Sequence, residues 1–78
     1  MPTVKSIGPL KFFFWSAEGH EPMHIHVERD DKMAKYWLEP VAYASSHGFS
    51  VRELNRIERL VVENRDDFVK AWNEHFRI

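Results

Sequence analysis

Three histidines in the first half of the chain are the residues best suited to chemistry. They occur as His20-x3-His24-x-His26, and Glu28 continues the pattern. Side chains two residues apart on a β-strand point to the same side, so His24, His26 and Glu28 share one face if this segment is a strand. Such a face offers imidazole nitrogens and a carboxylate for proton transfer or for metal binding.

One interpretation of this cluster is a transition-metal site. Two or three histidines, with or without a carboxylate, suit zinc, nickel or iron, and a free coordination position would carry a water nucleophile. The chain contains no cysteine, which excludes thiolate zinc sites and disulfides alike. The expected metal ligands are His20, His24, His26 and Glu28.

A second interpretation needs no metal. Because imidazole titrates near neutral pH, His24 and His26 can act as general acid and base, with Lys35 as the cation that stabilises charge on a phosphoryl group. RNA or another phosphoester is the substrate class, since a histidine can activate a 2′-hydroxyl and aromatic side chains can stack on bases. A third interpretation is that these histidines are polar residues on the solvent side of a half-buried sheet.

The elements that must position these residues are short strands. Residues Met23–Glu28 alternate apolar and polar side chains with period two, which is typical of a strand with one buried face. We therefore expect an antiparallel meander of three to four strands over about residues 10–44. The other expected strands are Lys11–Ser16, Met33–Leu38 and Val41–Ala44.

A long amphipathic helix is predicted over about residues 51–76, after a loop at residues 45–50. The segment Ser50–Glu53 is a capping box, which indicates where the helix begins. The spacing of the apolar residues predicts a helix packed on one face of the sheet. Asn64-Arg65 interrupts the apolar stripe, so the helix either continues through this point, which we favour, or breaks there. The stripe consists of Leu54, Ile57, Val61, Phe68, Trp72 and Phe76.

Length and composition limit the possible classes of protein. A chain of 78 residues supports one modest core, so we expect a single α+β domain over residues 1–78. Eleven basic and twelve acidic residues give a formal charge of -1, and therefore no overall positive field attracts nucleic acid. No stretch resembles a signal peptide or the roughly 20 apolar residues of a membrane span, so we expect a cytoplasmic location and no membrane partner.

The aromatic residues favour an interaction surface. On the first expected strand, Phe12 and Phe14 point to one face, while Phe13 and Trp15 point to the other. Large aromatic side chains therefore remain on whichever face does not meet the helix. Because exposed apolar patches usually mark interfaces, we expect a homodimer or a partner protein. The predicted interface residues are Phe12, Phe14, Trp37, Trp72 and Phe76.

A set of short motifs is distributed along the chain. They are His20, Pro22, His24–Val27, Ala34–Leu38, Pro40-Val41, Gly48, Glu53-Leu54 and Ala71–Asn73. Together, from about Gly8 to Phe76, they resemble the bacterial domain-of-unknown-function family 4160. The resemblance implies a small prokaryotic protein, often encoded beside another short domain in pairs that look like toxin–antitoxin operons. This chain has Pro22-Met23 where the family pattern commonly has two prolines, which makes the turn less rigid.

Three hypotheses about function follow. The leading one is a small prokaryotic interaction module of a toxin–antitoxin-like gene pair, which binds itself or a neighbour-encoded protein. The second is a histidine-dependent ribonuclease or phosphoesterase, metal-assisted or metal-free. The third is a small transition-metal-binding domain whose ion stabilises a small core.

Overall fold

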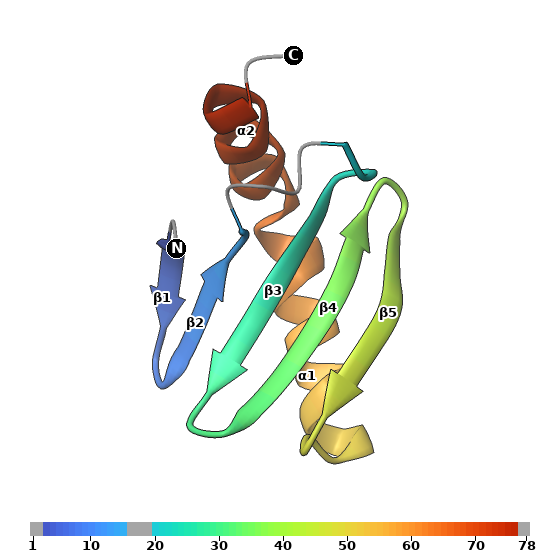
Figure 1. Ribbon diagram of the computed structural model, residues 1–78. Helices are drawn as coiled ribbons and strands as arrows, with labels where there is room; N and C mark the ends of the chain where they lie inside the picture. The colour runs from blue at the N-terminus through green and yellow to red at the C-terminus, as the bar shows by residue number, and fades with distance from the viewer. Residues whose placement is uncertain (1–2, 16–19, 77–78) are drawn as a thin grey trace.

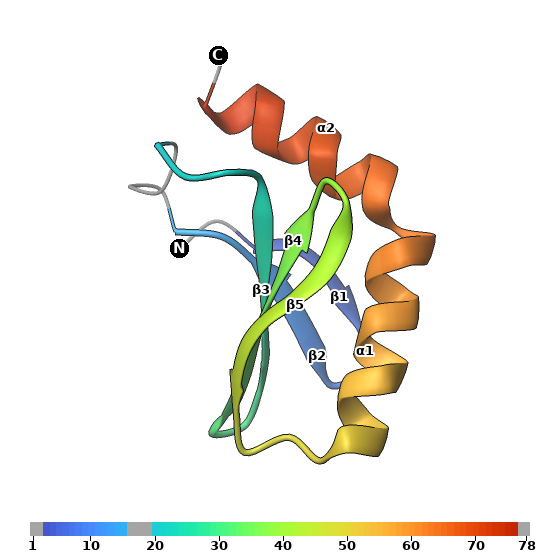
Figure 2. The ribbon, with the colours of Figure 1, turned by 90° about the vertical axis from the view of Figure 1, so that its right-hand side faces the viewer.

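The computed structural model describes residues 3–15 and 20–76. Over these residues the protein is an α+β fold in which five antiparallel strands lie in sequence order, α1 packs on one side of the sheet and α2 crosses one end of it (Figures 1 and 2). The predicted α+β class and antiparallel sheet are confirmed. The elements are β1 (Thr3–Ile7), β2 (Leu10–Phe13), β3 (His24–Arg29), β4 (Lys32–Leu38), β5 (Val41–His47), α1 (Val51–Glu63) and α2 (Arg65–Phe76).

The predicted numbers of strands and helices are wrong. β1 was not expected, because it is a partly exposed edge strand without the clear alternation of a half-buried strand. β5 continues through residues 45–47, which were assigned to a loop. The expected strand at Lys11–Ser16 ends earlier, at Phe13, and Ser16 lies outside the described residues.

The C-terminal helix breaks at Asn64, so the favoured prediction of a continuous helix is wrong and the alternative break is correct. The side-chain amide of Asn64 donates to the Leu60 carbonyl over 2.8 Å. Two contacts from the sheet also hold the junction. Lys5 Nζ donates to Asn64 Oδ1 over 2.9 Å, and Arg65 Nε donates to the Leu38 carbonyl over 2.6 Å. From this junction α2 turns across the end of the sheet (Figure 2).

The turn lets aromatic residues of α2 enter the core instead of overhanging the sheet. The ring of Phe68 stacks on Phe12 at a centroid distance of 5.2 Å. The ring of Trp72 packs against Phe14 at 5.4 Å. All four side chains are buried, and burial of large aromatic side chains is a main source of stability in a small core.

A buried hydroxyl links β4 to α1. Tyr36 Oη donates a hydrogen bond of 2.9 Å to the Leu54 carbonyl. Burial, with smaller contributions from Glu58 and Tyr43, raises the pKa of Tyr36 to about 12. The phenol therefore stays protonated at neutral pH and remains a donor to the helix.

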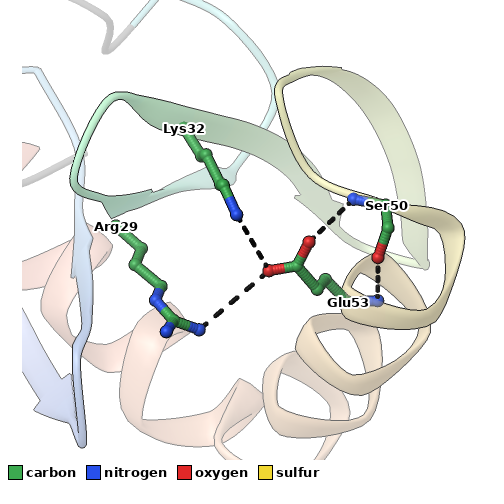
Figure 3. Close-up of polar contacts among 4 residues, drawn as sticks. All are labelled: Arg29, Lys32, Ser50 and Glu53. Carbon is green, nitrogen blue, oxygen red and sulfur yellow. Dashed lines mark hydrogen bonds and ion pairs between the residues drawn. The ribbon is translucent and has the colours of Figure 1, made fainter.

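The predicted capping box is present at the start of α1 (Figure 3). Glu53 N–H donates to Ser50 Oγ over 3.1 Å, and Ser50 N–H donates to the Glu53 carboxylate over 2.9 Å. The same carboxylate lies 3.4 Å from Lys32 Nζ and 4.0 Å from an Arg29 guanidinium nitrogen. Since Arg29 ends β3 and Lys32 begins β4, Glu53 connects the helix start to this hairpin.

We expect Glu53 to make stability depend on pH in acid. The hydrogen bonds from Ser50, backbone first, and the Lys32 charge lower the pKa of Glu53 from 4.5. The folded state therefore binds a proton less readily than the unfolded state, and this stabilisation is lost as pH falls below about 4.5. Glu53→Gln should weaken the fall in melting temperature between neutral pH and pH 3.

The matched control is Glu58→Gln on the same helix, and Glu53→Gln should weaken the fall more than this control does. Some acid sensitivity should remain in both variants, because the hydrogen bond from Lys5 also lowers the pKa of Asp67. Equal slopes for Glu53→Gln and the unmodified chain would contradict the assignment.

Candidate functional site

The strand register separates the two faces of the sheet. Ile25 lies opposite Tyr36 and Val27 lies opposite Ala34, and all four are buried. The residues between them on β3 therefore point away from the helices. In the described part of the chain no helix covers this second side, which we call the open sheet face (Figure 2). Its residues are Lys11, Phe13, His24, His26, Glu28, Met33, Lys35, Trp37, Ala42, Ser45 and His47.

Glu21 and Trp15, two described residues between β2 and β3, contact residues at one end of the open sheet face. Glu21 reaches Lys35 with an O···N distance of 2.9 Å. Trp15 packs edge-on against Phe13 at a centroid distance of 5.4 Å. At this end Phe13 and His24 have no exposed surface, although both belong to the open sheet face. The accessible part of the face therefore begins at His26.

His24 is a structural residue in this arrangement. Its Nδ1 donates a hydrogen bond of 2.9 Å to the Pro22 carbonyl. Its ring lies 4.9 Å from the Trp72 ring and 5.8 Å from the Trp37 ring. Because its exposed fraction is 0%, His24 cannot meet a substrate in this structure. The prediction that His24 acts directly as a catalytic acid or base is therefore corrected.

The predicted metal ligands are not assembled into one site. His20 is exposed, His24 is buried in aromatic side chains, and Glu28 lies on β3 opposite Lys11 and Met33. Within residues 3–15 and 20–76, no three His, Asp or Glu side chains are grouped so that they could hold a metal ion. The described residues therefore do not fit the expected zinc, nickel or iron site.

His26 and Lys35, both predicted site residues, share a groove with His47, which was not predicted. His26 lies directly opposite Lys35 across β3 and β4, and Lys35 lies opposite Ser45 on β5. His47 lies opposite Met33, on the same face. These five residues, together with Ala34 and Ser46, line a groove of about 240 Å³, which we call the histidine groove.

His47 reaches the histidine groove because of an irregularity in β5. Tyr36 opposes Tyr43, whereas Lys35 opposes Ser45, so Ala44 is an extra residue on β5. An extra residue reverses the face on which all later side chains lie. Without it, His47 would point toward the helices. The length of β4 and its short turn could have predicted a longer β5, but no residue pattern marks the bulge.

Lys35 is held between an acid and an indole. Its ammonium lies 2.9 Å from Glu21 Oε1 and 4.6 Å from the centroid of the Trp37 ring. The Lys35 side chain keeps 20% of its surface exposed. A negatively charged ligand in the groove would therefore compete with Glu21 for this ammonium group.

The predicted interface residues divide between core and surface. Phe12, Phe14 and Trp72 are at most 2% exposed, so they belong to the core and cannot contact a partner in this fold. This part of the interface prediction is corrected. Phe76 is partly buried at 4.3 Å from the Trp72 ring, and Trp37 is partly buried on the open sheet face.

A family model described as Domain of unknown function (DUF4160) matches residues 10–73 of the 78-residue chain. The chain belongs to the DUF4160 family. The match contains all the strands that carry the histidine groove, and it confirms the predicted resemblance. No curated protein and no solved structure matches this DUF4160 chain. Among the described helices, none has the length and apolar character needed to cross a membrane.

The structural role of His24 predicts a loss of stability on truncation. His24→Ala removes a buried ring and its hydrogen bond, so the free energy of unfolding should fall by about 2–4 kcal/mol. His20→Ala, at an exposed position in the same motif, should change it by no more than about 0.5 kcal/mol. Urea unfolding at neutral pH measures both values. A neutral His24→Ala substitution would contradict the structural assignment.

Proposed function

We propose that this DUF4160 protein is a cytoplasmic interaction module of a toxin–antitoxin-like gene pair, and that its open sheet face binds the protein encoded beside it. One observation carries the proposal: apolar side chains stay exposed on or beside a face that no described helix covers. Trp15 is 44% exposed and Met33 is 36% exposed. Both lie on the side of the sheet opposite α1.

The surroundings of these side chains also resemble a protein interface. Trp37 adds a partly exposed indole, and Lys11 and His47 supply exposed polar groups nearer the ends of their strands. Protein interfaces combine an aromatic and methionine-containing centre with a polar rim. The gene pairs implied by the family resemblance favour a neighbour-encoded partner over a second copy of this chain.

The metal-binding alternative has no supporting ligand set among the described residues. In the enzymatic alternative, His24 cannot be the acid or base that contacts the substrate, because that side chain is buried. The interaction proposal depends on neither of these residue sets.

The test uses matched substitutions of exposed apolar residues on opposite sides of the molecule. Met33→Asp places a charge on the open sheet face, whereas Val62→Asp places one on α1, where Val62 is 57% exposed. The probe is the purified neighbour-encoded protein, and calorimetry measures the Kd. We expect Met33→Asp to weaken binding at least about tenfold, because an interface centre excludes unpaired charge. Val62→Asp should leave the Kd unchanged.

Three outcomes would contradict the proposal. The first is a lack of measurable binding to the neighbour-encoded protein. The second is equal weakening by Met33→Asp and Val62→Asp. The third is a dimeric mass for the unmodified chain that Met33→Asp converts to a monomeric mass, because a second copy would then occupy the face.

A further inference from the structure

The histidine groove is lined by two histidines and a lysine that lie on three adjacent strands. His26 is on β3, Lys35 is on β4 and His47 is on β5, all on the open sheet face. We propose that this groove binds an RNA phosphodiester and cleaves it, with His26 and His47 as the acid–base pair and Lys35 as the stabilising cation. This activity goes beyond the proposed interaction with a partner protein and does not rest on it.

The positions of the two histidines on β3 and β5 suit in-line displacement at phosphorus. β3 and β5 are separated by β4, and His47 lies two residues along β5 from Ser45, which is in line with His26, so the two histidine backbones are diagonal and about 12 Å apart. A phosphodiester between the two imidazoles would be approached from opposite sides. In-line transfer needs this arrangement, because the attacking and leaving oxygens lie on opposite sides of the phosphorus atom.

The His26 ring is held in place by its neighbours. It stacks on the buried Phe13 ring at a centroid distance of 5.4 Å and an angle of 22°. The Trp15 and His24 rings meet it edge to face, at centroid distances of 6.4 Å and 5.1 Å. His26 stays partly exposed in the groove despite these contacts. A fixed and accessible imidazole is suited to proton transfer, since it needs little reorganisation.

Indole rings next to the groove favour a nucleic acid over a free phosphate. Trp15 packs beside His26, and Trp37 lies beneath the Lys35 ammonium. Unpaired RNA bases stack on such aromatic side chains, whereas inorganic phosphate gains nothing from them. The hydroxyl of Ser45, opposite Lys35, adds a hydrogen-bond donor for a phosphate oxygen.

The proposed step is a transesterification within the RNA. One imidazole accepts the proton of the 2′-hydroxyl, and the 2′-oxygen forms a bond to phosphorus. The bond from phosphorus to the 5′-oxygen breaks, and the second imidazole, initially protonated, donates its proton to that leaving oxygen. The products are a 2′,3′-cyclic phosphate and a 5′-hydroxyl. The reaction consumes no water, metal ion or redox partner.

The assay uses the full chain, EDTA and an end-labelled single-stranded RNA of mixed sequence. We expect a product ending in a 2′,3′-cyclic phosphate, and no cleavage of the DNA counterpart, which lacks the 2′-hydroxyl. Each of His26→Gln and His47→Gln should lower the rate at least about 100-fold. His20→Gln is the matched control, because His20 is exposed and outside the groove, and its rate should be unchanged.

A binding measurement separates the role of Lys35 from folding. Because Glu21 holds the Lys35 ammonium, Glu21→Gln should tighten binding of an uncleavable 2′-O-methyl RNA, whereas Lys35→Gln should weaken it. Fluorescence anisotropy measures both Kd values, and melting curves show that each variant is folded. Changes in the same direction would overturn the role assigned to Lys35.

Other results would overturn the proposed reaction. These are no RNA cleavage by the unmodified chain, RNA binding without cleavage, equal cleavage of DNA, or a rate that His47→Gln does not change. Failure of the partner-binding test would leave the cleavage assay unaffected. The two proposals can therefore fail separately.

Discussion

The structure depends on one constraint, which is that a 78-residue chain provides a single helical layer for a five-stranded sheet. The contacts of Phe68 and Trp72 with β2 and with Phe14 just beyond it place that layer on one side. Strand alternation then sends every second side chain of the sheet to the other side. The same packing that forms the core therefore leaves an aromatic and histidine-containing face without a covering helix among the described elements.

The two ends of the open sheet face differ in exposure. His24 and His26 point the same way, but Glu21 and Trp15 lie toward the end that contains His24. His24 becomes a buried structural residue that packs on Trp72, while His26 stays accessible. Two histidines on the same face of β3 therefore have different roles. The accessible titratable side chains are His26 and its neighbours on β4 and β5.

The features that could be predicted from the sequence are local in origin. The capping box at Ser50 and Glu53 and the alternation of β3 depend on neighbouring residues, and both are present. The edge strand β1 has little alternation to detect, and the helix break depends on contacts that Lys5 and Arg65 make with distant residues. The place of His47 depends on an extra residue, Ala44, which changes the register without a sequence signal.

The two proposals concern the same surface, because the histidine groove lies on the open sheet face. A protein bound to that face would therefore cover the groove. The central claim is that this face, and not the helical layer, is where the molecule binds its ligands. NMR titration of the full chain with an uncleavable 2′-O-methyl RNA tests it most directly. We predict that the largest shift changes lie at His26, Lys35 and His47. Changes confined to α1 and α2, or no changes at saturating RNA, would contradict the account.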